Sequence, residues 1–179
     1  MMDEHILIDE IRKGNRQAMQ TLYGQTVGYV VGVCQRYLSN QEDVRDVVQD
    51  CYLQFFQHID GFTYKGGNSI KAWMAKVVVN KSIDLLRQKQ HWQFVDEEIP
   101  DIADEPVDLS SIKAERLHWL IRQLPTGYRT ILNLYVFERK SHQEIARIMG
   151  IKPDTSASQY HRAKALLKEM ILQHKEDFV

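Results

Sequence analysis

A run of helix start and stop signals in residues 125–171 constrains the fold more than any other feature of this sequence. Ser141 and Glu144 have the spacing of a capping box, in which each side chain accepts a hydrogen bond from the backbone of the other residue. Gly150 can adopt the left-handed conformation that ends a helix, and Pro153 suits the first turn of the next helix. The segment therefore predicts a helix-turn-helix with a four-residue turn.

The helix that begins near Pro153 divides into two faces when successive residues are placed 100° apart. The residues expected to pack inward are Ser156, Tyr160, Ala163, Leu167 and Met170. The opposite face carries Ser158, His161 and Arg162, with Gln159 on its flank. It combines small residues with hydrogen-bond donors that can read base edges in a major groove. Every amphipathic helix has a polar face, but the capping box, the glycine turn and a local positive charge favour a DNA-binding interpretation.

Within this motif, Arg162 is the candidate for a base contact, because an arginine can bond to two acceptors of guanine. Other cations are better suited to phosphates, which fix position without reading sequence. They are Arg139, Lys140, Arg147, Lys152 and Lys164. On the preceding helix a buried stripe is expected to support the motif. It consists of Ile131, Leu134, Tyr135 and Phe137.

The remainder of the chain also has helical periodicity, with almost no alternation typical of strands. A helical hairpin is expected over residues 4–38, a third helix over 41–59 and a fourth over 69–90. The predicted fold is all-α, with an N-terminal four-helix domain, an acidic linker and a C-terminal four-helix domain that contains the helix-turn-helix.

Charge separates the chain into three blocks. Residues 1–88 have a net charge of 0, residues 89–110 of −6 and residues 111–179 of +5. The middle block also holds two prolines and cannot bury enough apolar area to order itself. We therefore expect domains at 1–90 and 111–179, joined by an acidic flexible linker at 91–110.

Composition argues against several classes of protein. No apolar run approaches the roughly 20 residues that span a bilayer, and the first residues are acidic where a signal peptide is basic, so a cytoplasmic protein without membrane insertion is expected. Cys34 and Cys51 are interpreted as small buried hydrophobes. A phosphate-binding glycine loop, a nucleophile motif and a metal-ligating cluster are all missing from the sequence, so we expect neither an enzyme, a cofactor nor a metal site.

The N-terminal half contains side chains suited to single-stranded DNA, since unpaired bases need aromatic stacking and backbone neutralisation. The candidates in a short loop are Phe62, Tyr64, Lys65 and Asn68, and those on the following helix are Trp73, Lys76, Asn80 and Arg87. From the residues alone the alternatives stay open, because a tryptophan such as Trp73 is more often a core residue than a platform for bases, and Asn80 can be part of a solvated face.

The order of these motifs resembles the extracytoplasmic-function (ECF) sigma factors, small two-domain members of the bacterial sigma superfamily. The resemblance covers about residues 17–89 and 112–172. It is carried by Glu42–Asp50, Ile70–Met74, Asn80–Arg87, Leu124-Pro125, Arg129, Glu144–Ala146 and Arg162–Lys164. None of these motifs is specific alone, but their order and spacing are.

The resemblance implies a promoter-recognition subunit of RNA polymerase. Core polymerase would bind Asp46, Gln49 and Asp50, the Phe62–Asn68 loop with Trp73 and Asn80 would capture a flipped base of the minus-ten element, and the helix-turn-helix would read the minus-thirty-five element. Promoter DNA in duplex and single-stranded form, core polymerase and an anti-sigma factor are the implied partners. The alternative is a stand-alone helix-turn-helix regulator.

This sequence departs from the family pattern at three positions of the helix-turn-helix. Lys152 stands where serine is frequent, Ser156 where a hydrophobe is frequent and Ala157 where a basic residue is frequent. The departures leave the expected fold unchanged but leave the promoter sequence open.

Overall fold

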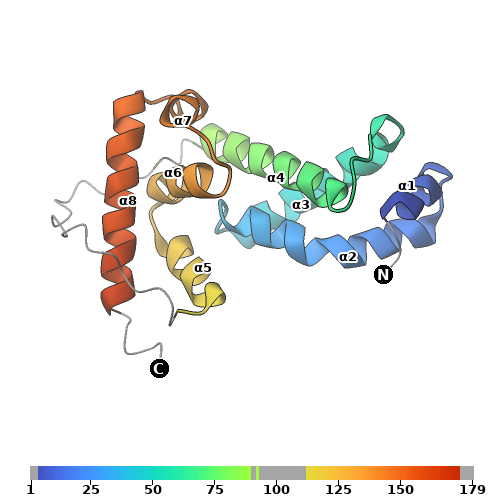
Figure 1. Cartoon of the computed structure of the whole chain (residues 1–179), viewed down its shortest axis with the longest axis horizontal. Helices are drawn as coiled ribbons and strands as arrows, with labels where there is room; N and C mark the ends of the chain where they lie inside the picture. The colour runs from blue at the N-terminus through green and yellow to red at the C-terminus, as the bar shows by residue number, and fades with distance from the viewer. Residues whose placement is uncertain (1–3, 90–91, 93–111, 174–179) are drawn as a thin grey trace. The chain divides into compact units, whose positions relative to one another are not determined.

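In the computed structural model, residues 4–89, 92 and 112–173 are described, and all their regular structure is helical. The helices are α1 (Glu4–Arg12), α2 (Arg16–Gln35), α3 (Gln41–Gln57), the 3₁₀ turn η1 (Ile59–Gly61), α4 (Ser69–Gln88), α5 (Ala114–Gln123), α6 (Thr126–Val136), α7 (His142–Met149) and α8 (Pro153–Gln173). The prediction of an all-α fold is confirmed (Figure 1). Except for Trp92, the linker expected at 91–110 lies outside the described residues. The chain divides into two compact units after Leu85.

Asparagine caps fix where the helices of the first unit begin. The Asn15 side chain accepts the Gln17 amide at 3.0 Å at the start of α2, and the Asn40 side chain accepts the Glu42 amide at 2.8 Å at the start of α3. Such caps satisfy backbone donors that have no partner within the helix. They end the α1–α2 and α2–α3 connections sharply, so each helix presents a defined apolar face.

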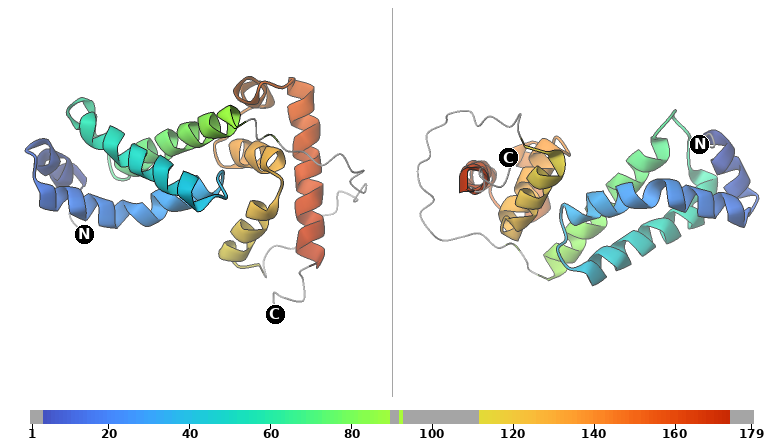
Figure 2. Two further views of the ribbon diagram at one scale, coloured as in Figure 1. Left: turned by 180° about the vertical axis from the view of Figure 1, so that it is seen from behind. Right: turned by 90° about the horizontal axis from the view of Figure 1, so that it is seen from below.

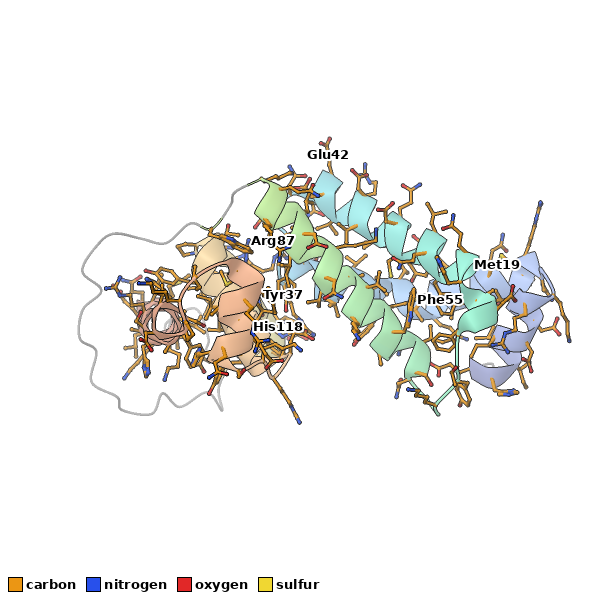
Figure 3. All side chains as sticks on the ribbon, turned by 90° about the horizontal axis from the view of Figure 1, so that it is seen from above. Met19, Tyr37, Glu42, Phe55, Arg87 and His118 are labelled. Carbon is orange, nitrogen blue, oxygen red and sulfur yellow. The ribbon has the colours of Figure 1, made fainter. Side chains whose placement is uncertain are left out.

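Phe55 of α3, labelled in Figure 3, lies at the centre of the aromatic packing in the first unit. Its ring centroid is 5.4 Å from that of Phe62 and 5.3 Å from that of Trp73, both edge-on. Such edge-on pairs are a favoured arrangement of aromatic rings. Phe55 therefore joins α3 both to the segment after η1 and to the first turns of α4.

The two cysteines are buried in the first unit, as the sequence predicted. Cys34 Sγ lies 3.7 Å from Ser82 Oγ, and Cys51 Sγ lies 3.7 Å from the Met74 carbonyl oxygen. Burial raises the pKa of the Cys34 thiol to about 11 and that of Cys51 to about 12.

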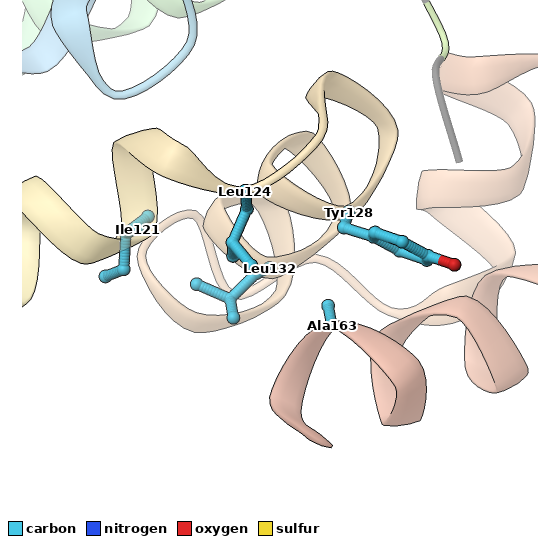
Figure 4. Packing of buried hydrophobic residues seen from close by; sticks show 5 residues of the cluster. All are labelled: Ile121, Leu124, Tyr128, Leu132 and Ala163. Atoms are coloured by element: carbon cyan, nitrogen blue, oxygen red, sulfur yellow. The ribbon is translucent and has the colours of Figure 1, made fainter. Parts of the chain in front are cut away.

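In the second unit, α8 packs against α5, α6 and α7 (Figure 2). A buried cluster joins three of these helices and the turn between α5 and α6. It consists of Ile121, Leu124, Tyr128, Leu132 and Ala163. Figure 4 shows Ala163 of α8 facing Tyr128 and Leu132 of α6, where its small side chain permits close approach.

The stripe expected on α6 is only half buried. Ile131 and Leu134 are in the core, whereas Tyr135 is 39% exposed and Phe137 is 37% exposed, so the prediction was wrong for these two. Tyr135 stacks on the His142 ring at the surface, and Phe137, the C-cap of α6, keeps helical dihedrals with its ring centroid 6.3 Å from that of His118. Of the helices described, none is long and apolar enough to cross a membrane.

Candidate functional site

The turn into α7 has the predicted capping box. Ser141 Oγ accepts the Glu144 amide at 3.3 Å, and Glu144 Oε2 accepts the Ser141 amide at 2.8 Å. The Ser141 hydroxyl also lies 2.9 Å from Glu144 Oε2, and the hydrogen bonds that the Ser141 amide and hydroxyl donate to the carboxylate lower the pKa of Glu144 below its ordinary value. At the other end of α7, Gly150 is left-handed with φ of 69°, and its N–H donates to the Ala146 carbonyl. The two signals set the length of α7 and the sharp turn into α8.

Side-chain contacts fix which face of α8 points inward. Ser156 is buried, and its Oγ lies 3.0 Å from His142 Nδ1 at the start of α7, which is hydrogen-bonding distance. The His142 ring stacks on the Tyr135 ring of α6 with ring centroids 4.8 Å apart, and the centroid of the Tyr135 ring lies 4.4 Å from that of Tyr160 of α8. Polar and aromatic contacts thus join all three helices at the level of Ser156 and Tyr160.

The opposite face of α8 is open to solvent. Ser158, His161 and Arg162 are exposed, as are Lys152 and Lys164. The Lys164 ammonium lies 5.2 Å from the centroid of the Tyr160 ring, at the edge of this face. Gln159 differs from these residues, because it is half-buried and its side-chain oxygen is buried without a hydrogen-bond partner in the described structure.

The loop before α4 has a defined backbone. Gly66 has φ of 107° and Asn68 has φ of 68°, conformations that glycine and asparagine tolerate best. Ser69 Oγ accepts the Lys65 amide at 3.1 Å and in turn donates to the Gly66 carbonyl. The loop thereby folds back onto the first residue of α4.

The aromatic candidates of this loop are anchored, not free. Phe62, Tyr64 and Trp73 are each half-buried, Phe62 and Trp73 against Phe55 and Tyr64 against His5. Their rings are therefore held in place while part of each surface stays accessible. The side of Trp73 that meets Phe55 belongs to the core, and a role of its remaining surface in binding bases stays a prediction.

The exposed polar and charged side chains of the loop are followed by others on one face of α4. Lys65, Asn68, Lys76, Asn80 and Arg87 are exposed. Trp73, Lys76 and Asn80 follow each other at steps of three and four residues, and Arg87 lies seven residues, two helical turns, after Asn80, so the four share a face.

One of the three candidates on α3, Gln49, lines a groove that the sequence did not reveal. Asp46, Gln49 and Asp50 are exposed, and Asp50 Oδ2 pairs with Lys81 Nζ of α4 at 2.9 Å. Gln49 also lines a groove of about 500 Å³ between α2 and α3, walled by apolar side chains. They are Tyr23, Val27, Val31, Val44, Val48, Tyr52, Leu53 and Phe56.

Two members of this wall are unusually exposed for their type, Tyr23 at 49% and Leu53 at 50%. Apolar surface of this kind marks sites of protein–protein contact. Among the described residues, no group of three or more His, Cys, Asp or Glu side chains could hold a metal ion.

Comparison with known proteins agrees with this geometry. The family model of Sigma-70 region 2 matches residues 22–91, and that of Sigma-70 region 4 matches residues 114–167. The RNA polymerase sigma factor SigV of Bacillus subtilis is 30% identical over 79% of this chain and 82% of its own length. The chain belongs to the ECF family of RNA polymerase sigma factors.

Other ECF sigma factors match over most of this chain. The ECF RNA polymerase sigma factor SigW of Bacillus subtilis is 23% identical over 92% of the chain and 94% of its own length. The ECF sigma-E factor of Haemophilus influenzae is 23% identical over 95% of the chain and 96% of its own length. Among solved structures, CnrH in complex with the cytosolic domain of CnrY shares 22% identity with a TM-score of 0.48, covering 93% of this chain and 95% of that one.

Family membership decides between the two functions that the sequence allowed. A sigma factor directs RNA polymerase to promoters, so core RNA polymerase and promoter DNA are the partners of this ECF sigma factor. A stand-alone regulator is not needed to explain the helix-turn-helix.

Proposed function

We propose that this ECF sigma factor reads the minus-thirty-five element as duplex DNA through the exposed face of α8. Ser158, His161 and Arg162 are all solvent-exposed on that face, while Ser156 on the opposite side is bonded to α7. A helix whose inward face is fixed and whose outward face carries donors is suited to a major groove. Lys152 and Lys164 would contact phosphates at its edges. Gln159, being half-buried, contributes less than the other three.

The loop 62–68 and the adjoining face of α4 would hold the opened minus-ten strand. Separating a base-pair step costs about 1.4 kcal/mol on average, and stacking a base on an aromatic side chain contributes roughly 1–3 kcal/mol. Phe62, Tyr64 and Trp73 supply anchored rings, and Lys65, Lys76 and Arg87 supply positive charge. A few captured bases can therefore offset the cost of opening when polymerase also holds the protein in place.

The α2–α3 side of the first unit would bind core polymerase. Asp46, Gln49 and Asp50 are exposed on α3, and Gln49 together with Arg45 also lines the apolar groove that contains Tyr23 and Leu53. A groove rimmed by charged and amide side chains fits a helical partner surface of mixed character. The clamp helices of the largest polymerase subunit are the proposed occupant.

These roles correspond to three segments of the chain. Residues 1–90 would bind polymerase and the minus-ten element, 111–179 the minus-thirty-five element, and the acidic segment 91–110 would link them. An anti-sigma factor would compete for the same surfaces. Because it acts on polymerase, the protein would work in the cytoplasm.

Run-off transcription with purified core polymerase on a genomic library tests this function. The full chain is expected to comigrate with core polymerase and to direct initiation at a specific set of promoters, whose shared sequence identifies both elements. A chain that fails to bind core polymerase but binds an operator tightly by itself would contradict the proposal.

Asn80→Ala tests whether the α4 face acts in strand opening and not in binding of duplex DNA. Asn80 is exposed on the α4 face, so its loss is expected to slow strand opening while closed-complex formation stays unchanged. Permanganate reactivity measures opening, and gel shift at low temperature measures the closed complex. Equal losses at both stages would mean that Asn80 has only a structural role.

A further inference from the structure

Helix α1 contacts the loop before α4 at the beginning, the middle and the end of that loop. Arg12 bonds to the carbonyl of Phe62, the His5 ring meets the Tyr64 ring, and Glu4 accepts the amide of Ser69. The partners are 50 to 65 residues apart in the two hydrogen bonds. The three contacts therefore do not arise from chain proximity but from the way α1 packs in the first unit.

Arg12 makes the strongest of these contacts. Its Nη2 donates to the Phe62 carbonyl oxygen at 2.7 Å, and its Nε donates to the Ile59 carbonyl oxygen at 3.4 Å. Hydrogen bonds from a charged donor are stronger than neutral ones. One guanidinium thus joins η1 to the first residue of the loop and fixes the direction in which the loop leaves η1.

Glu4 acts at the other end of the loop. Its Oε2 accepts the Ser69 amide at 3.1 Å, at the first residue of α4. A carboxylate suits this place because the first amides of a helix have no partner within the helix and its N-terminus is partly positive. Between the two ends, the His5 and Tyr64 rings meet edge-on with centroids 5.5 Å apart.

The buried side of α1 fixes this helix firmly enough to position a loop. Leu7, Ile8 and Ile11 are all buried, so the helix is packed into the core along one side. A side chain projecting from such a helix is held more precisely than one projecting from another loop. The contacts from α1 therefore fix where the 62–68 loop lies relative to the core of the first unit.

Preorganisation explains why such support matters for binding a base. Ordering a flexible loop at the moment of binding has an entropic cost that lowers affinity. In this protein the loop is already bent by left-handed Gly66 and Asn68 and is closed onto Ser69. With both ends also fixed by α1, Tyr64 and Lys65 are held in one arrangement before DNA arrives.

We infer that α1 is a positioning element for strand opening, with Arg12 and Glu4 as the positioning residues that hold the 62–68 loop in its base-binding shape. The inference rests on the proposed role of that loop. It assigns a function to a segment outside the Sigma-70 region 2 match, which begins at residue 22.

Two substitutions and two matched controls test this inference in holoenzyme assembled from the full chain. Arg12→Ala removes both carbonyl contacts, and Glu4→Ala removes the acceptor of the Ser69 amide. Glu4→Gln keeps an acceptor oxygen at the same place. Lys13→Ala removes a charge next to α1 that is not directed at the loop. Lys13 Nζ pairs with Oε1 of Glu10 on α1 at 2.8 Å.

Three quantities are measured for each variant: core polymerase affinity, the rate of strand opening on the promoter found by run-off transcription, and amide hydrogen exchange of residues 62–69. Arg12→Ala is expected to slow opening roughly tenfold, the lower end of the effect of a charged hydrogen bond. Glu4→Ala has a smaller effect of the same kind. Both raise exchange in the loop, leave core affinity unchanged, and reduce discrimination among bases at the captured minus-ten position.

Normal opening and unchanged loop exchange in Arg12→Ala and Glu4→Ala would overturn the inference. So would equal losses of opening in Glu4→Gln and Glu4→Ala without faster loop exchange in either, because the loss would then not come from the shape of the loop. If Arg12→Ala fails to fold, the comparison of Glu4→Ala with Glu4→Gln tests the inference by itself.

The same measurements distinguish failure of the inference from failure of the proposed function. Faster loop exchange with normal opening, together with normal opening in Asn80→Ala, would show that α1 positions the loop but that the loop does not hold the opened strand. Normal loop exchange with impaired opening in Asn80→Ala would leave the proposed function standing and remove α1 from it.

Discussion

The α7–α8 motif and the 62–68 loop are both short surface segments, but they are held in place by different kinds of contact. In α7, the capping residues Ser141 and Glu144 are three positions apart, and Gly150 ends the helix by its own conformation. The 62–68 loop also has local contacts, from Ser69 to Lys65 and Gly66, but in addition it is bonded at its two ends to Arg12 and Glu4, whose partners are 50 and 65 residues away in the chain.

This difference indicates how each region responds to change. A motif built from local contacts keeps its shape as long as its own residues are intact, because each contact closes a short loop of chain. A loop held from a distance changes shape whenever the core beneath it moves. The 62–68 loop is therefore expected to be sensitive to core substitutions that leave the helix-turn-helix unaffected.

The largest effect is expected for Phe55→Ala. Phe55 is buried and contacts both Phe62 and Trp73, and truncating a buried phenylalanine typically costs about 3–5 kcal/mol of stability. Urea denaturation measures the loss, and hydrogen exchange locates it. Amides of the loop are expected to lose protection while those of α7 keep theirs. Leu53→Ala, at an exposed position of the same helix, is the control and changes stability little.

Arg162→Ala, in the α7–α8 motif, is expected to have the next largest effect. Loss of a bidentate contact to guanine removes about 1–3 kcal/mol of discrimination between promoter and non-promoter duplex. Competition gel shifts with holoenzyme measure it. Lys164→Ala, a phosphate contact in the same proposal, should weaken both duplexes alike. Reduced affinity of Arg162→Ala for core polymerase would contradict its assignment to DNA.

Ser141→Ala is expected to have a smaller and strictly local effect. Removing a helix N-cap costs about 1 kcal/mol, and the Ser141 hydroxyl accepts the Glu144 amide three residues away. Thermal unfolding of the full chain gives the size, and exchange of the first amides of α7 gives the place. Increased exchange in residues 62–69 would show that the two regions are coupled.

The smallest effect is expected from titrating Glu144. Its hydrogen bonds to Ser141 lower its pKa in the folded protein below the ordinary 4.5, so the unfolded chain takes up this proton first as the pH falls. The contribution to stability is complete above about pH 4.5 and is lost below it. Glu144→Gln has no such titration, so its stability should fall less over this range. Parallel unfolding curves for both proteins down to pH 3 would contradict this.

The features that sequence predicted correctly are those whose partners are close in the chain. Ser141, Glu144 and Gly150 were assigned from spacing alone, and the two faces of α8 follow from helical periodicity. Periodicity went wrong at Tyr135 and Phe137, whose rings meet His142 and His118 and remain exposed.

Contacts between distant segments could not be predicted, because periodicity shows which face of a helix is apolar but not which faces meet. The pairing of Asp50 with Lys81 and the groove between α2 and α3 depend on that arrangement. So does the hydrogen-bonding contact of His142 with Ser156. The roles of the exposed residues in binding DNA and polymerase remain predictions.

The burial of Cys34 and Cys51 has a practical consequence for studying this protein and a biological one. With their pKa values raised to about 11 and 12, both side chains carry almost no thiolate at neutral pH, and only the thiolate reacts readily. A cysteine introduced on an exposed face, such as that of α8, can therefore be labelled selectively with a maleimide dye while the native pair stays in place. For the same reason, Cys34 and Cys51 are poor targets for peroxide and other thiol oxidants, so a redox response of this sigma factor is not expected to begin at either cysteine.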